Sequence, residues 1–324
     1  MNSLWLQIRS NAPGLPGPFL QEHRNAYQVC YGAWQMAVTI GVSAERPPIC
    51  NATPLVDDAQ CGIWLRRADE STVIADCDIH LEKNLGRARA GPQPGHLNLY
   101  QLNGQPPHSP ADVASQLYAG VLFPISCVIL LSVDGLGGVA ESARALAVWL
   151  HFSSRIDIQP PPRLLVSTRT ELTLEKFLFA LTLEMRHTLG KDITSYSQAK
   201  DAWSRRVESI HIVRPTTNLE LIRTHVDKIS KLRKQHYYNF SPPHFLRLLQ
   251  QAVVSFADRS EKPFDLLRAL GILDPATEQA RVNLKEFLNA PLTDQGIAAI
   301  ASSLVLNTYS HSSHCKYSPS TKLR

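Results

Sequence analysis

The residues best placed to do chemistry form a glycine-rich segment, Asp134-Gly135-Leu136-Gly137-Gly138, that follows a run of apolar residues. A strand that ends in such a turn before a helix can present backbone N–H groups to an anion. Asp134, Gly135, Gly137 and Gly138 are therefore candidate nucleotide-binding residues. The simpler interpretation, which we favour, is that these glycines only make a tight turn from strand to helix.

A second polar segment, Asp76-Cys77-Asp78-Ile79-His80, ends an apolar stretch of β-branched residues. Two carboxylates and an imidazole at a strand end have the chemistry for metal binding or for acid–base catalysis. The alternative, which we prefer, is the polar start of a loop with one capping aspartate. A hydrolase site built from Asp76, Asp78, His80 and Asp134 is the catalytic hypothesis that these residues allow.

The motifs that would complete an enzyme are absent from the sequence. It contains no phosphate-binding loop G-x-x-x-x-G-K-[ST], no nucleophile elbow G-x-S-x-G and no C-x-x-C pair. The cysteines are predicted to be free thiols of a reducing compartment: Cys30, Cys50, Cys61, Cys77, Cys127 and Cys315. We therefore expect no catalytic residue, no metal ion, no cofactor and a cytoplasmic location.

The basic residues do not concentrate in the way a nucleic-acid-binding face requires. The net charge is +5, and Lys and Arg are spread along the chain. One cluster, Lys228, Lys231, Arg233 and Lys234 with Tyr237 and Tyr238, could touch phosphates or an acidic membrane, but a solvated helix face is the usual meaning of such a run. The segment His311–Cys315 has metal-like spacing in a polar tail. The longest apolar run, 121–133, is too short to span a membrane.

The pattern of apolar residues predicts an α/β fold. Residues 62–66 and 72–75 read as a β-hairpin, and continuous apolar runs at 125–133, 164–166 and 210–213 read as strands buried on both faces of a mostly parallel sheet. Helices are expected at 111–122, 140–150 and 172–186, with a long loop at 83–110. Residues 27–42 fit either a strand or a helix. From residue 217 onward the pattern is helical only, at 219–238, 243–258, 263–270, 278–288 and 293–306.

These elements predict four regions along the chain. Residues 1–25, rich in Pro and Gly, are expected to be a flexible lead-in. Residues 26–215 should form the α/β domain. Residues 216–308 should form a helical C-terminal region, and residues 309–324 a disordered tail.

The spacing of Gly62-Ile63-Trp64, Asp76, the 125–133 strand and Arg169 resembles the G-domain of guanylate-binding-protein and atlastin-type GTPases. In that family a "GIW" strand pairs with a strand ending in Asp-x-x-Gly, and a later strand ends in a base-reading Arg-Asp pair. Asp76 and Arg169 match, whereas Ile79 and Thr170 replace the glycine and the aspartate. The phosphate loop is missing at 30–38, where the resemblance would place it. The resemblance implies a degenerate, P-loop-lacking domain of GTPase type over about 27–215.

A second resemblance covers more of the chain. The aliphatic strand running into Asp134-Gly135-Leu136-Gly137-Gly138, the later Leu164-Leu165-Val166, the Pro-Phe-Asp at 263–265 and the segment 301–309 are similar to the N-terminal region of large fungal patatin-like phospholipase proteins. The glycine segment also resembles the oxyanion loop of patatin-like lipases, but Val139-Ala140-Glu141 stand where that loop carries a basic residue. This resemblance implies a family member without its lipase domain, so no catalytic residue is carried over.

These observations lead to three hypotheses. The first is a non-catalytic, GTPase-like regulatory or interaction module with an unknown protein partner, retaining at most a vestigial nucleotide site at Asp76, Asp134 to Gly138 and Arg169. The second is a working GTP-binding protein with a non-standard phosphate loop at Asp134–Gly138. The third is the hydrolase described above.

Overall fold

The computed structural model describes residues 2–9, 19–41, 62–78, 96–102, 110–152, 160–189, 195–215, 219–235 and 240–258. All of them belong to one compact unit, Met1–Phe264, and none to the second unit, Asp265–Arg324. The helices predicted at 263–270, 278–288 and 293–306, and the tail at 309–324, lie outside the described residues.

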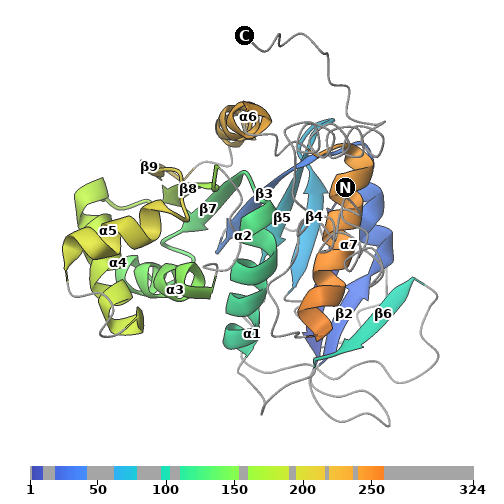
Figure 1. Ribbon diagram of the computed structural model, residues 1–324, viewed down its shortest axis with the longest axis horizontal. Coiled ribbons are helices and arrows are strands. Elements are labelled where there is room, and N and C mark those ends of the chain that lie inside the picture. Colours follow the sequence, from blue (N-terminus) through green and yellow to red (C-terminus); the bar gives the residue numbers. More distant parts are fainter. Residues whose placement is uncertain are drawn as a thin grey trace, which may run out of the picture. The chain divides into compact units, whose positions relative to one another are not determined.

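The first unit is an α/β structure built on a nine-stranded sheet with the order β6-β2-β1-β4-β5-β3-β7-β8-β9 (Figure 1). The strands are β1 (Asn2–Arg9), β2 (Phe19–His23), β3 (Gln35–Ile40), β4 (Ile63–Arg67), β5 (Thr72–Cys77), β6 (Leu97–Gln101), β7 (Val128–Ser132), β8 (Arg163–Ser167) and β9 (Ile210–Val213). Four pairings are antiparallel and four are parallel. The prediction of a mostly parallel sheet is therefore wrong, because the sheet is mixed.

The parallel half of the sheet is the part that the apolar runs predicted. Strands β5, β3, β7, β8 and β9 are parallel to one another, and β4 pairs antiparallel with β5 at their side. The predicted hairpin and the three later strands are confirmed. The ambiguous segment 27–42 contains both a 3₁₀ helix, η1 (Arg24–Cys30), and strand β3.

The antiparallel half comes from segments that were predicted to be irregular. Strands β1 and β2 occupy the stretch expected to be a flexible lead-in, and β6 lies inside the expected loop at 83–110. Those two expectations are wrong. Their partners are distant in the sequence, since Ser3 pairs with Leu65 and Leu20 with Tyr100. Local composition carries no information about such long-range pairing, so Pro and Gly near β1 and β2 dominated the prediction.

The helices agree with the predicted positions where both exist. They are α1 (Pro110–Leu117), the π-helical turn η3 (Tyr118–Leu122), α2 (Phe123–Ile125), α3 (Val139–Phe152), α4 (Leu174–Leu189), α5 (Tyr196–Ser204), α6 (Leu219–Gln235) and α7 (Pro242–Asp258). Helix α5 was not predicted, although a capping box between Ser195 and Gln198 begins it. Among the described helices, none is long and apolar enough to cross a membrane.

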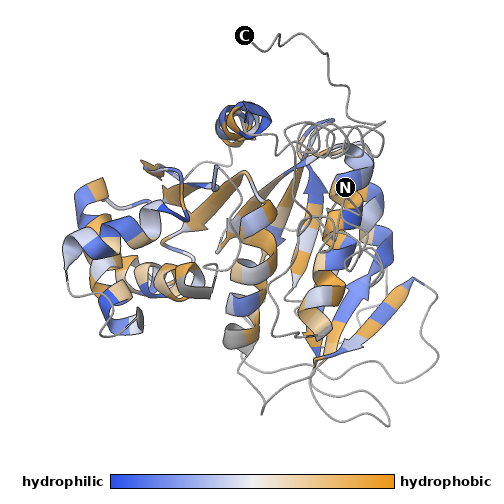
Figure 2. Cartoon of the chain, in the orientation of Figure 1, coloured by the Kyte–Doolittle hydropathy of each residue, from blue (hydrophilic) through white to orange (hydrophobic). Residues whose placement is uncertain are grey.

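The parallel strands are covered on both faces, which explains their continuous apolar sequences. Ile222, Val226 and Ile229 of α6 pack on a face that includes Ala37 of β3 and Val128 of β7. Because side chains alternate along a strand, Val38, Ile129 and Leu131 point to the opposite face, and they are buried too. Figure 1 shows α6 on one side of β7 and β8 and α3 on the other, and Figure 2 shows these strands as mainly hydrophobic.

Helices α6 and α7 belong to the same compact unit as the sheet. Helix α6 supplies part of the sheet's core, and each fully buried aliphatic side chain stabilises the fold by about 1.5–3 kcal/mol. The part of the predicted helical region that the structure describes is thus helical, and it lies in the same unit as the sheet.

Candidate functional site

The candidate residues lie along the carboxyl-end edge of the parallel strands. From β3 the chain passes to β4 and β5 on one side, and from β7 it passes to β8 and β9 on the other. The strand order therefore reverses between β3 and β7, and open α/β sheets place their ligands in the crevice at such a point. The predicted segment Asp134–Gly138 follows β7 at this crevice.

The glycine turn lies against the end of β3. A β-carbon on Gly135 would stand 1.7 Å from the carbonyl oxygen of Gly41, the residue that follows β3. Gly41 itself has a φ of 70°. Its own β-carbon would be 3.2 Å from the carbonyl oxygen of Ser132. The backbone of the turn therefore occupies the crevice between the ends of β3 and β7.

The N–H groups of the turn are largely used within the turn. Gly135 donates to the Ser132 hydroxyl at 3.2 Å, Leu136 to the Ser132 carbonyl at 3.1 Å, and Gly138 to the Val133 carbonyl at 2.8 Å. Gly137 and Gly138 have φ values of 92° and 114°, which glycine adopts without strain. These are the hydrogen bonds of a strand-to-helix turn. The three N–H groups that make them are not available to bind an anion.

Two predicted site residues, Asp134 and Arg169, do come together. Oδ2 of Asp134 accepts a hydrogen bond from the backbone N–H of Arg169 at 2.9 Å, which joins the turn after β7 to the turn after β8. The second turn is held by Thr168, whose hydroxyl accepts the Thr170 N–H at 3.2 Å. The Arg169 side chain is exposed. The Asp134 carboxylate thus works as a local clasp, and its negative charge at this edge disfavours a bound phosphate.

Asp76 is engaged elsewhere on the same sheet. Its carboxylate accepts from the Thr39 hydroxyl on β3 and from Nε of Arg66 on β4 at 2.7 Å, and the residue is buried. Within the described part of the chain no hydrogen bond or ion pair joins it to Asp134 or Arg169. Both oxygens of the Asp76 carboxylate therefore bond within the sheet.

The hydrolase hypothesis gains no support from these positions. Asp78 is buried, and its N–H donates to the Gly62 carbonyl at 2.9 Å. His80 lies outside the described residues, as do Tyr237, Tyr238 and His311–Cys315. In the described ranges no group of three or more His, Cys, Asp or Glu side chains is arranged to hold a metal ion.

The structure also describes residues 30–38, where the resemblance to GTPases would place a phosphate loop. Residues 30–38 contain the last residue of η1, a four-residue connection and the first four residues of β3. A loop that followed β3 would begin at Gly41, and the residues after it, 42–61, lie outside the described residues. That stretch contains no lysine.

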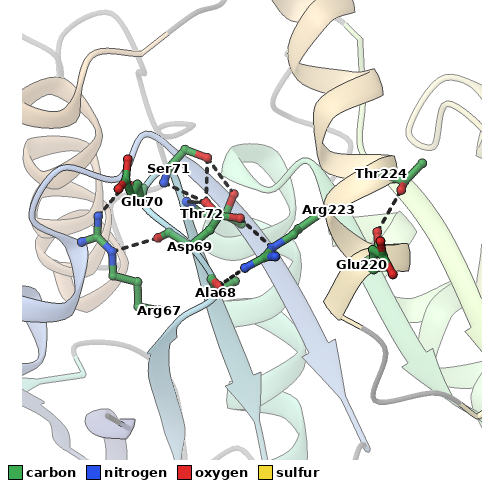
Figure 3. Close-up of polar contacts among 9 residues, drawn as sticks. All are labelled: Arg67, Ala68, Asp69, Glu70, Ser71, Thr72, Glu220, Arg223 and Thr224. Carbon is green, nitrogen blue, oxygen red and sulfur yellow. Dashed lines mark hydrogen bonds and ion pairs between the residues drawn. The ribbon is translucent and has the colours of Figure 1, made fainter.

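The turn between β4 and β5 carries a polar cluster that the sequence did not reveal (Figure 3). Oδ1 of Asp69 accepts from the N–H groups of Ser71 and Thr72 at 2.8 and 2.9 Å, while Oδ2 accepts from Nε of Arg223 on α6 at 3.1 Å. Burial alone would raise the pKa of the Asp69 carboxyl, but the hydrogen bonds from Ser71 and Thr72 hold that pKa below its usual value. Asp69 therefore fastens the turn between β4 and β5 to α6.

Of the predicted basic cluster on α6, one member is not solvated. Lys228, Lys231 and Lys234 are exposed, but Arg233 is buried. Its guanidinium donates to the carbonyls of Ser126 at 2.6 Å and of Ile125 and Pro160, both at 3.3 Å. The interpretation of a uniformly solvated face is wrong at this position, because the Arg233 guanidinium is buried against backbone carbonyls of the segments that lead into β7 and β8.

A pair of histidines lies where α6 packs on β9. The rings of His211 on β9 and His225 on α6 are 5.1 Å apart between centroids, and His225 is buried. Burial, then the neighbouring His211, Arg163 and Lys228, lower the pKa of His225 to about 4. Among the described residues Nδ1 of His225 has no hydrogen-bond partner. The pair is therefore neutral at pH 7 and packs as part of the α6 interface.

Comparison with known proteins adds no family: a scan against protein-family models found no match, and a search of curated proteins found none either.

Proposed function

We propose that this protein is a non-catalytic, GTPase-like interaction or regulatory module. The observation that carries the proposal is the contact between Gly135 and Gly41, which places backbone where an open α/β sheet would hold a ligand. A domain of this architecture that binds no nucleotide acts through its surface rather than through chemistry.

The strand arrangement supports the GTPase-like part of the proposal. The order β4-β5-β3-β7-β8-β9, with β4 antiparallel, has the "GIW" strand Ile63–Arg67 beside the strand that bears Asp76. Strand β3, which overlaps the segment 30–38 where the resemblance would place a phosphate loop, lies between β5 and β7, and the strand before Arg169, β8, follows β7. The hairpin of the "GIW" strand with the strand of Asp76, and a later strand that ends just before Arg169, are the features that the resemblance to guanylate-binding-protein and atlastin-type GTPases implies.

The bonding of the remnant residues supports the non-catalytic part. A triphosphate site needs backbone N–H groups that are not already hydrogen-bonded within the protein, a lysine and a magnesium ligand. Here the turn N–H groups of Gly135, Leu136 and Gly138 bond within the turn, and Asp134 is held by the Arg169 N–H. Asp76, in the place of the family's Asp-x-x-Gly aspartate, is held by Thr39 and Arg66.

A titration with fluorescent GTP and ATP, with and without magnesium, tests the proposal. We expect no saturable binding at nucleotide concentrations up to about 100 μM, which is a free energy of about −5.5 kcal/mol. Binding with a micromolar dissociation constant that depends on magnesium would reject the non-catalytic function and favour a non-standard phosphate loop. Turnover in a broad hydrolase screen that disappears in Asp134→Ala would instead favour the hydrolase.

A further inference from the structure

Exposed apolar side chains gather on the outer face of α4. Phe179 is 68% exposed and Leu183 is 45% exposed, although both are of a kind that folding normally buries. They are four residues apart on one helix, so they are neighbours on its surface. The inner face of the same helix is fully used, since Phe177, Leu181 and Met185 are buried.

Two cations bracket this apolar pair. Lys176 precedes Phe179 by three residues, Arg186 follows Leu183 by three, and both are exposed. At 100° per residue the four side chains fall within an arc of roughly 80°. The outer face of α4 therefore carries a ridge, Lys176–Phe179–Leu183–Arg186, with the three-four-three spacing through which one helix packs on another. Glu175 and His187 lie on either side of this ridge.

Building on the proposed interaction module, we propose that the α4 ridge binds an amphipathic helix of a partner protein, whose two apolar residues are flanked at each end by a carboxylate. The apolar residues of such a helix would cover Phe179 and Leu183. Its carboxylates would pair with Lys176 and Arg186, where charge complementarity sets orientation and register.

Two other occupants fit the ridge less well. A second copy joined by a two-fold axis would place Lys176 beside Arg186 of the other copy if the α4 helices are antiparallel. It would place Lys176 beside Lys176 of the other copy if they are parallel, and like charges disfavour both contacts. A membrane-surface helix needs a broad apolar face, whereas this ridge offers two large apolar side chains.

A library of helical peptides displayed on phage, randomised at the four positions that would face the ridge, tests the proposal with the full-length protein. We expect selection to enrich apolar residues at the two inner positions and Asp or Glu at the two outer ones. The best peptide, measured by fluorescence anisotropy, should bind Phe179→Ala/Leu183→Ala at least tenfold more weakly than the wild type. The matched control is Tyr31→Ala, which removes an aromatic side chain of similar exposure (63%) outside α4 and should leave binding unchanged.

A charge-reversal double variant distinguishes charge complementarity from non-specific hydrophobic binding. Lys176→Glu/Arg186→Glu should weaken the affinity for the acidic peptide by at least tenfold. The same variant should bind a form of that peptide in which Lys replaces the acidic residues. Failure to select any peptide, peptides without acidic residues, or binding that survives Phe179→Ala/Leu183→Ala would each overturn the proposal. So would α4-dependent sedimentation with phosphatidylserine vesicles, or a dimer that the same variant abolishes. Since the assay contains no nucleotide and measures no turnover, its failure is distinct from GTP binding or Asp134-dependent hydrolysis, either of which would overturn the proposed function.

Discussion

The carbonyl of Gly41 and the α-carbon of Gly135 approach so closely that the two turns share one space, and a β-carbon at Gly135 would lie 1.7 Å from the Gly41 oxygen. Gly41 follows strand β3, and Gly135 lies in the turn that follows strand β7. Their contact therefore joins the two strands that flank the reversal in strand order.

The first prediction concerns Gly135. Gly135→Ala should lower the free energy of unfolding by at least about 3 kcal/mol, because the added methyl group meets backbone that can move only with β3. Urea denaturation followed by circular dichroism measures the change. The matched control is Gly120→Ala in η3, where a β-carbon would meet no atom within 4 Å. There we expect unchanged stability or a gain of up to about 1 kcal/mol. Equal losses in both variants would contradict the close contact.

The second prediction concerns Asp69, which bonds the turn between β4 and β5 and pairs with Arg223 on α6. Asp69→Ala should destabilise the protein by about 2 kcal/mol, because two backbone N–H groups and the Ser71 hydroxyl lose their acceptor. Asp69→Asn keeps an acceptor oxygen and should lose about half as much. Arg223→Ala should lose no more than about 1 kcal/mol, since its side chain is 45% exposed.

The contribution of Asp69 to the free energy of unfolding should depend on pH. Hydrogen bonds lower the pKa of Asp69 in the folded state, so its contribution is present above the ordinary carboxyl pKa and is lost as the pH falls through the folded value. The difference in stability between the wild type and Asp69→Asn should therefore shrink below about pH 4. A double-mutant cycle with Arg223→Ala that gave no coupling at pH 7 would show that the ion pair contributes nothing.

The third prediction concerns the buried guanidinium of Arg233. Arg233→Met keeps much of the volume but leaves the Ser126, Ile125 and Pro160 carbonyls without their donor. We expect a loss of about 2–4 kcal/mol in chemical denaturation, in the range for unsatisfied buried polar groups. Lys234→Met, the exposed neighbour, is the control and should change stability by less than about 0.5 kcal/mol. Similar losses in the two variants would mean that Arg233 is as solvated as Lys234.

The fourth prediction concerns acidification at His225. Its folded pKa of about 4 is below the ordinary value of 6.5, so the unfolded chain binds the proton more readily. Stability from this residue is complete above pH 6.5 and is lost as the pH falls from 6.5 towards 4. One pKa unit corresponds to about 1.4 kcal/mol. Because solvent beside the neighbouring His211 screens the interactions that cause the shift, we expect a total effect of about 2 kcal/mol.

His225→Phe provides the comparison for that pH dependence. Subtracting its stability curve from that of the wild type removes the titration of the carboxylates common to both. The difference should change between pH 6.5 and pH 4 and stay constant from pH 7 to pH 8. A flat difference over the whole range would show that His225 titrates as in the unfolded chain.

The sequence predicted the parallel half of the fold because burial on both faces leaves a local mark. The runs around Ile129 and Leu165 are apolar without alternation, which is typical of a strand buried on two sides. Strands β1, β2 and β6 leave no such mark, since their pairing with residues far along the chain decides their structure. The prediction of a mostly parallel sheet followed from seeing only the strands of the first kind.

The candidate site was predictable as residues but not as contacts. The glycines after β7 and the match of Asp76 could be read from type and spacing. That Asp134 binds the Arg169 N–H, that Asp76 binds Arg66, and that Gly41 fills the crevice depends on strand order, which spacing does not specify. For the α4 ridge, a signal was present: with Phe177 and Leu181 on the buried face of the predicted helix, Phe179 and Leu183 must point outward.

The placement of β1 between β2 and β4 bears on how the chain is made. Strand β2 begins at residue 19 and is synthesised soon after β1, but β4 begins only at residue 63, and β6, which pairs with β2, at residue 97. During synthesis β1 therefore lacks its second partner until β4 has been made, and until then the unpaired backbone groups along that side of the strand are open to incorrect pairing.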